Sequence, residues 1–319
     1  MNVLVTGATT PLGRALVEHL LALRDVGHVL AVGAEHWGPG LPSDGTRFSY
    51  EQVDLTRGRS VHDLLYGPAR TCGIDTVLHG VLHRAVRDQG ERIHAINVEA
   101  TRLLVQACVR HPDIRRFVLR SGGEVYAIRS DEPNLLDEDR PLAFDAGAPQ
   151  WLRDRVEADL TTCAQIGTAG PAIAVLRCAE ILARGTGSQL WDYLGSRVCL
   201  RPLGFDPMIN VLSIDDAVAA AVAALSCDAR GAFNIPGFDT LPLSQLIARS
   251  GRHDVPVPGP LLAPLYRLRT RTVGFEFRYD LNVRRFHVGA LLDGGRARAV
   301  LGYQPRHPIA FPSHAALAA

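Results

Sequence analysis

Residues 3–13 read Val3-Leu4-Val5-Thr6-Gly7-Ala8-Thr9-Thr10-Pro11-Leu12-Gly13. The apolar residues predict a buried strand over 2–6, and the glycine-containing segment after them predicts a tight turn. Apolar side chains at helical spacing follow over 14–23. We therefore expect a strand, a turn and a helix in immediate succession at the start of the chain.

The same alternation continues along the first half of the sequence. We expect further strands over 28–32, 48–53, 76–79, 116–120 and 172–177, with helices over 60–65, 91–109 and 153–165. Short apolar strands that alternate with amphipathic helices are typical of a parallel sheet covered on both faces. The sequence therefore predicts a Rossmann-type α/β fold with a doubly wound parallel sheet.

The pattern loosens in the second half. We expect helices over 215–224 and 243–250, a strand over 231–235, and an interruption at four prolines over 256–264. The prediction is a Rossmann domain over residues 1–180 and a smaller capping region over 181–319. We expect this capping region to be interleaved with the first domain and not independent of it.

Composition excludes several classes of protein. The 319-residue chain has a net charge of +1, and all of its 34 Lys and Arg residues are arginine, so no field gathers nucleic acid or anionic membrane. The six cysteines contain no C-x-x-C pair, which favours reduced, buried thiols over a metal site. No apolar run approaches the roughly 20 residues of a membrane span, and no signal peptide precedes the first strand. We expect a cytoplasmic protein.

The first turn is the candidate ligand site. A turn between a strand and a helix gathers free backbone N–H groups at the positive end of the helix, where a pyrophosphate binds. We predict that this site binds a nicotinamide dinucleotide through Gly7, Thr9, Thr10, Pro11, Leu12 and Gly13. Thr10 stands where a second glycine is usual, and its hydroxyl could donate to a phosphate. The alternative is a tight connection that binds nothing.

The end of the second predicted strand bears on the choice between NAD and NADP. An acidic residue there would accept hydrogen bonds from the adenosine ribose, but the chain has Gly33, followed by Ala34 and Glu35. Glu35 could reach the ribose if the turn allows it. This slightly favours NAD over NADP, and both stay open.

Several segments in addition to the first turn resemble the extended short-chain dehydrogenase/reductase family, the sugar-nucleotide epimerase and dehydratase group. They are Val53-Asp54-Leu55-Thr56, residues 75–80, residues 97–104, residues 211–216 and Leu301-Gly302-Tyr303-Gln304-Pro305. The resemblance implies cofactor contacts from Asp54, Leu55, Gly80 and Asn97. It also implies a homodimer through the helices over 91–109 and 153–165.

The resemblance further implies a catalytic serine, tyrosine and lysine, and this chain departs from all three. Gly122 stands at the serine position, Trp151 at the tyrosine position and Arg155 at the lysine position. An indole N–H does not act as an acid near neutral pH, whereas Arg155 could still bind the cofactor ribose. The usual proton donor is therefore missing.

Two functions stay open. In the first, the chain is an oxidoreductase or epimerase-like enzyme with a displaced acid, and the candidate catalytic residues are Tyr126, Ser121 and Arg155, with Glu124 and His83 as weaker candidates for the acid. In the second, it is a catalytically inactive NAD(P)-binding sensor or partner protein. Whether the chain is an enzyme is therefore uncertain.

An apolar stretch in the capping region bears on the substrate. Residues 261–266 read Leu-Leu-Ala-Pro-Leu-Tyr, and Phe275 and Phe277 follow. These residues would line a pocket for an apolar small molecule. A buried core helix is the alternative, and we prefer it slightly.

Overall fold

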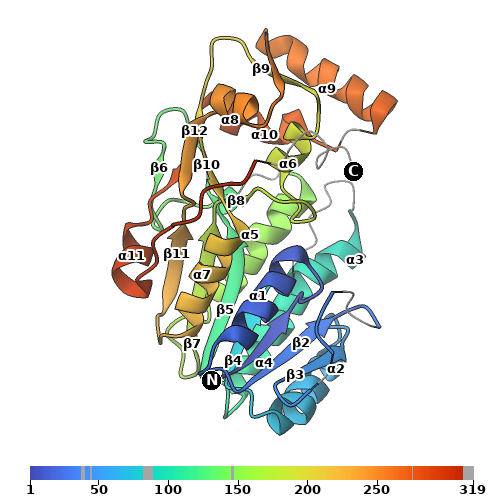
Figure 1. Ribbon diagram of the computed structural model, residues 1–319, viewed down its shortest axis with the longest axis vertical. Helices are drawn as coiled ribbons and strands as arrows, with labels where there is room; N and C mark the ends of the chain where they lie inside the picture. The colour runs from blue at the N-terminus through green and yellow to red at the C-terminus, as the bar shows by residue number, and fades with distance from the viewer. Residues whose placement is uncertain (37–39, 44, 82–88, 145–146, 275, 312–319) are drawn as a thin grey trace.

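The computed structural model describes the chain except for residues 37–39, 44, 82–88, 145–146, 275 and 312–319 (Figure 1). Its main sheet has the strand order β11-β7-β5-β4-β1-β2-β3, and all neighbouring strands are parallel. The strands are β1 (Asn2–Thr6), β2 (His28–Gly33), β3 (Phe48–Gln52), β4 (Thr76–His79), β5 (Arg116–Gly122), β7 (Ala172–Cys178) and β11 (Gly231–Ile235). The predicted doubly wound parallel sheet is confirmed.

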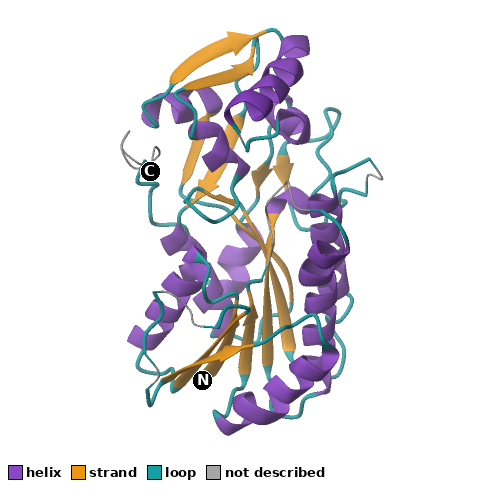
Figure 2. Cartoon of the chain, turned by 90° about the vertical axis from the view of Figure 1, so that its right-hand side faces the viewer, coloured by secondary structure: helices purple, strands orange, loops and turns teal. Residues whose placement is uncertain are grey.

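Helices cover both faces of the sheet (Figures 1 and 2). One face carries α1 (Pro11–Ala22), α7 (Ile214–Leu225) and α11 (Gly295–Leu301), and the other carries α2 (Gly58–Leu64), η1 (Leu65–Ala69), α4 (Ala100–Arg110) and α5 (Gln150–Cys163). A separate apolar core fills the space on each side of the sheet. Burial on both faces explains why these strands are apolar along their whole length.

Two predicted helices differ in detail. Helix α1 begins at Pro11, because the Thr10 side chain accepts a hydrogen bond from the Gly13 N–H (3.1 Å) and proline suits the first helical position. The helix predicted over 91–109 is divided into α3 (Glu91–His94), a π-helical segment η2 (Ala95–Glu99) and α4. The π-helical turn shifts the helical register directly at Asn97.

The capping region is built from small sheets and short helices at one end of the molecule (Figure 1). Its elements are β6 (Leu135–Leu136), β8 (Glu180–Ile181), α6 (Gln189–Leu194), β9 (Val198–Pro202), β10 (Met208–Leu212), β12 (Asp239–Pro242), α8 (Leu243–Arg249), β13 (His253–Val257), α9 (Gly259–Val273), α10 (Tyr279–His287) and β14 (Leu291–Leu292). A third core holds this region together. Strand β11 and helix α7 follow residue 180 in the chain but belong to the main sheet and its covering layer.

The prolines over 256–264 do not interrupt the chain as predicted. Pro260 lies in the first turn of α9, where its missing N–H costs nothing, and Pro264 lies inside the same helix. Leu262 and Tyr266 from this helix are buried in the capping core, so the core alternative for the apolar stretch agrees with the structure. Across the described ranges, none of the helices combines the length and apolar character that crossing a bilayer requires.

Candidate functional site

The turn after β1 is closed by glycines. Gly7 has a φ of +69°, and a Cβ on it would lie 3.1 Å from the backbone of Gly80 at the end of β4. A Cβ on Gly13 would overlap the carbonyl oxygen of Gly7. Thr10 also closes the turn, because its hydroxyl donates to the Gly7 carbonyl (2.8 Å). The hydroxyl proton is donated within the turn in this structure, and its contact with a phosphate stays a prediction.

A small cavity of about 20 Å³ lies beneath this turn, with room for about one water molecule. Its lining includes the turn residues Gly7, Thr10, Leu12 and Gly13, together with Gly80 and the side chain of Arg120 from β5. Pro11, the first residue of α1, places the positive end of the helix beside the turn. The structure thus brings the predicted phosphate-binding residues to the carboxyl edge of the sheet.

The end of β2 supplies a carboxylate. Glu35 accepts a hydrogen bond from the Thr9 hydroxyl (3.0 Å), and a Cβ on Gly33 would lie 2.9 Å from a Glu35 carboxylate oxygen. The Glu35 carboxylate therefore occupies the region into which a side chain at Gly33 would point.

The segment after β3 supplies a second acidic residue and an apolar one. Hydrogen bonds from Thr56 are the main cause that lowers the pKa of the exposed Asp54. Leu55 next to it is buried. Both follow β3 at the same edge of the sheet as the glycine turn.

A buried polar chain ties β1, β4 and the long helix together. His79 hydrogen bonds with Thr6 (2.8 Å) and with Thr101 (2.9 Å), and burial lowers its pKa to about 4, so its ring is neutral. Asn97 is buried one helical turn before Thr101, and its side chain donates to Asp154 at 3.5 Å. These hydrogen bonds tie the carboxyl ends of β1 and β4 to the helix that carries Thr101.

Ser121 and Tyr126 belong to a second buried network. The Ser121 hydroxyl donates to Asp159 (2.6 Å), which also pairs with the guanidinium of Arg177 (2.7 Å). The Tyr126 hydroxyl donates to Asn234 (2.7 Å) and accepts from Arg177 (3.0 Å). Tyr126 is 2 % exposed, and burial raises its pKa to about 12. A phenol of this kind does not release its proton near neutral pH.

This network was not anticipated from the sequence as a unit. Arg177 gave the only signal, since it is a charged residue at the end of an otherwise apolar predicted strand. The geometry does not favour Tyr126 or Ser121 as a proton donor, and both roles stay predictions. His83, a weaker candidate, lies outside the described residues.

The residues at the family's catalytic positions form a different arrangement. Arg155, whose side chain is 2 % exposed, pairs with Glu124 in the turn after β5. A Cβ on Gly122 would overlap the Glu124 carboxylate, so this carboxylate fills the volume of the absent serine side chain. Trp151 places its indole N–H in a buried position that has no hydrogen-bond partner among the described residues.

A further arginine from the capping region faces this group. Arg285 on α10 pairs with Glu180 at the start of β8. Burial lowers the pKa of Arg285 to about 10, and the nearby Glu124 carboxylate opposes this effect. Arg285 therefore stays protonated at neutral pH, and two carboxylates alternate with two guanidinium groups at the site.

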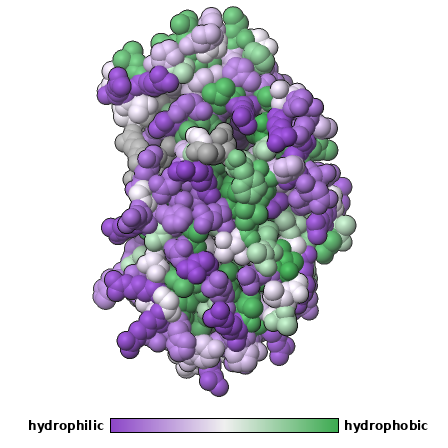
Figure 3. Space-filling view, turned by 180° about the vertical axis from the view of Figure 1, so that it is seen from behind, coloured by the Kyte–Doolittle hydropathy of each residue, from purple (hydrophilic) through white to green (hydrophobic). Residues whose placement is uncertain are grey.

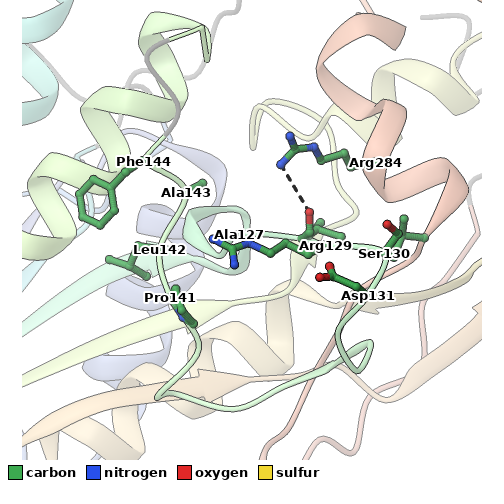
Figure 4. Close-up of a pocket in the computed structure, with 11 residues that line it drawn as sticks. Ala127, Arg129, Ser130, Asp131, Pro141, Leu142, Ala143, Phe144 and Arg284 are labelled. Atoms are coloured by element: carbon green, nitrogen blue, oxygen red, sulfur yellow. Dashed lines mark hydrogen bonds between the residues drawn. The ribbon is translucent and has the colours of Figure 1, made fainter.

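A cavity of about 590 Å³ is lined in part by the segment that follows Tyr126 in the sequence (Figure 4). It is lined by residues 127–131, which directly follow Tyr126, by residues 141–144, and by Arg284 and Val288. Figure 4 shows the side chains of Arg129 and Arg284 at the cavity, where Arg284 donates to the carbonyl of Ile128 (3.4 Å). The lining is mixed in polarity, and the cavity is large enough for a small molecule.

Comparison with known sequences points to one family. The model of the NAD dependent epimerase/dehydratase family matches residues 3–147. An uncharacterised protein from Mycobacterium tuberculosis is 32% identical over 315 residues, which cover 95% of this chain and 80% of that protein. A 3-diazoavenalumate denitrifying reductase from a Streptomyces species is 30% identical over 318 residues, which cover 97% of this chain and 97% of that protein.

Solved structures share the fold at lower sequence identity. UDP-glucuronic acid 4-epimerase from Bacillus cereus, in complex with UDP-glucuronic acid and NAD, has a TM-score of 0.70 at 16% identity and covers 97% of this chain and 95% of its own. A dTDP-glucose 4,6-dehydratase from Streptomyces venezuelae with NAD bound has a TM-score of 0.69 at 21% identity, with 97% and 94% covered. Together with the family model and the relatives at 30% and 32% identity, this shows that the chain belongs to the NAD dependent epimerase/dehydratase family.

Proposed function

We propose that the chain is an NAD-dependent reductase of small molecules. The glycine turn carries this proposal: Gly7 packs against Gly80 and Gly13 against the Gly7 carbonyl, so the chain turns directly into α1, whose positive end a diphosphate could approach. The Streptomyces relative, which is named a reductase, supports the reaction type.

The preference for NAD over NADP rests on Glu35. Its carboxylate lies beside Gly33, where it could accept hydrogen bonds from both ribose hydroxyls and would repel a 2′-phosphate. On the same cofactor, Arg155 would bind the nicotinamide ribose in place of the family's lysine. When bound, the dinucleotide would supply or accept a hydride.

A titration with NADH and NADPH, followed by nicotinamide fluorescence, tests this proposal. We expect NADH to bind more tightly, and Glu35→Ser to reduce the preference for NADH about tenfold, a change of about 1.4 kcal/mol. Glu18→Ser on the exposed side of α1 removes the same charge elsewhere and is the matched control. If neither nucleotide binds at about 1 mM, a free energy of about −4 kcal/mol, the proposal is wrong.

A catalytically inactive NAD(P)-binding protein is the second candidate. The observation that favours it is the commitment of Ser121 and Tyr126 to a buried network, where neither hydroxyl is available for proton transfer. This candidate would be favoured if the protein binds NADH but does not oxidise it in the presence of any acceptor.

We also propose a homodimer through α4 and α5. Figure 3 shows apolar side chains gathered in the middle of the face seen from behind, the side of the sheet on which α4 and α5 lie. Leu160 on α5 is 36% exposed on this helix pair. We expect Leu160→Asp to convert a dimer to a monomer in sedimentation experiments, whereas Leu268→Asp on the exposed side of α9 leaves the mass unchanged.

A further inference from the structure

We propose that this site reduces an acceptor whose reacting group already carries a positive charge, namely an iminium ion. In this reaction the hydride step takes no proton from the protein. The inference rests on the proposed reductase function and names the substrate class of the same site. The Glu124 carboxylate, which occupies the place of a serine hydroxyl at Gly122, is the observation that leads to it.

The exchange of a hydroxyl for a carboxylate removes a hydrogen-bond donor from the reacting group. In carbonyl reduction, negative charge develops on oxygen, and hydrogen-bond donors near that oxygen stabilise the transition state. An ionised carboxylate only accepts hydrogen bonds, so it offers no donor to a developing alkoxide. Glu124 therefore disfavours a carbonyl substrate and favours a cationic one.

Two of the arginines near Gly122, Arg155 and Arg285, do not replace the missing donor. Arg155 pairs with Glu124, and Arg285 pairs with Glu180, so each guanidinium already has a carboxylate partner. The pairs offset one another in charge, and little positive potential is left to stabilise an oxyanion.

Among the described residues, the neighbouring hydroxyl groups are also engaged. The hydroxyl protons of Ser121 and Tyr126 are donated within the buried network, at 2.6 Å and 2.7 Å. Trp151 presents a buried indole N–H that can donate a hydrogen bond but does not titrate near neutral pH. Such a donor can orient an acceptor without giving up its proton.

A cationic acceptor needs no acid. The hydride brings two electrons and one hydrogen to the iminium carbon, which forms the new C–H bond. The former C=N π pair becomes the lone pair of a neutral amine, and the positive charge passes to the oxidised dinucleotide. No alkoxide forms, and atoms and charge balance without a proton from the protein.

The test uses a matched pair of probes on the protein with NADH. N-methyldihydroisoquinolinium carries the cationic C=N group, and α-tetralone carries an uncharged C=O group in a similar bicyclic frame. We expect the ratio of kcat/KM for the iminium to kcat/KM for the ketone to fall about tenfold in Glu124→Gln, because the intrinsic reactivity of each probe cancels in this comparison. The hydride step should be independent of pH between about 6 and 9 and show no solvent isotope effect.

Binding provides a readout that is independent of turnover. Calorimetry without cofactor should show the iminium binding more tightly than the ketone, and Glu124→Gln should weaken iminium binding about tenfold while leaving ketone binding unchanged. Asp63→Asn removes an exposed carboxylate on α2 and is the control. Because Glu124→Gln neutralises the carboxylate that pairs with the buried Arg155, the double variant Glu124→Gln/Arg155→Gln serves if the single variant does not fold.

The outcomes separate this inference from the proposed function. If NADH fails to bind, both the reductase proposal and this inference are wrong. If NADH binds but the ketone is reduced as efficiently as the iminium, only the substrate class is wrong. A pH-dependent hydride step that becomes pH-independent in His83→Ala would likewise overturn it, because a protein acid would then take part.

Discussion

The glycine turn after β1 and the turn after β5 meet the same edge of the sheet, but they have diverged to different extents. The first keeps its form although Thr10 replaces a glycine, because backbone N–H groups and a helix end depend on chain geometry and tolerate many side chains. At the second, Gly122 stands where the family resemblance predicts a serine, and proton transfer is sensitive to such a change because it depends on the chemistry of individual side chains. Binding of a dinucleotide can therefore outlast the family's usual proton donors.

Breaking the buried network tests the comparison most strongly. We expect Arg177→Met to lower the free energy of unfolding by about 3–5 kcal/mol, since it leaves the fully buried Asp159 charged without its partner. Urea denaturation measures this change. Arg59→Met, from an exposed pair with Asp63, should change nothing measurable. A stable Arg177→Met protein that has lost only activity would show that the network serves chemistry and not the fold.

Closing the glycine turn should have the next largest effect. A methyl group on Gly13 overlaps the Gly7 carbonyl, so Gly13→Ala should cost about 2–3 kcal/mol of stability and abolish NADH binding. Thermal denaturation and NADH fluorescence measure the two effects. Gly67→Ala is the control, because a Cβ there meets no atom within 4 Å. Normal NADH affinity in Gly13→Ala would place the cofactor elsewhere.

Tyr126 separates a structural role from a catalytic one. Tyr126→Phe removes a hydrogen bond and leaves the Asn234 oxygen without this donor, so we expect a loss of about 1–2 kcal/mol and an unchanged hydride-transfer rate. Chemical denaturation and single-turnover kinetics test both halves. A rate that falls by about 100-fold or more would restore Tyr126 as the proton donor.

The smallest effect concerns the start of α5, which carries Arg155. Its neighbour Asp154 accepts a hydrogen bond from His94 (2.9 Å), and this bond is the main cause that raises the pKa of His94 above 6.5. The charged pair therefore stabilises the fold fully below about pH 6.5, and its contribution is lost as the pH rises through the pKa of the folded state.

The His94 side chain is 39% exposed, so solvent screens the pair and we expect a contribution below about 1 kcal/mol. The free energy of unfolding of the wild type and of His94→Gln should converge once the pH is well above the raised pKa of His94 in the folded state. A difference that persists there would mean that His94 acts through packing and not through charge.

The fold could be predicted because apolar periodicity is a local property. Strands 2–6 and 76–79 agree with β1 and β4 residue by residue, since parallel strands buried on both faces leave uninterrupted apolar runs. The start of α1 was missed by three residues because the cap and first turn, Thr10 and Pro11, are not part of the apolar stripe. The prediction of a break at Pro264 was wrong because α9 continues through it.

The site was only partly predictable. The sequence predicts, by position, departures from the family's usual catalytic residues. The placement of the Glu124 carboxylate beside Gly122 could not be predicted, because it depends on the short turn η3 (Gly123–Val125) and on the pairing with Arg155. Likewise, Asn234 joins Tyr126 across 108 positions of the chain, and no local pattern signals such a partner.

That long-range partnership limits how the protein can be divided. Asn234 lies on β11, which pairs with β7 and completes the sheet only after the chain has built much of the capping region. A fragment that stops at residue 180 would leave β7 as an open edge and deprive the Tyr126 phenol of its acceptor. We therefore expect the dinucleotide-binding half to aggregate when it is expressed alone, and the two halves to unfold as one cooperative unit.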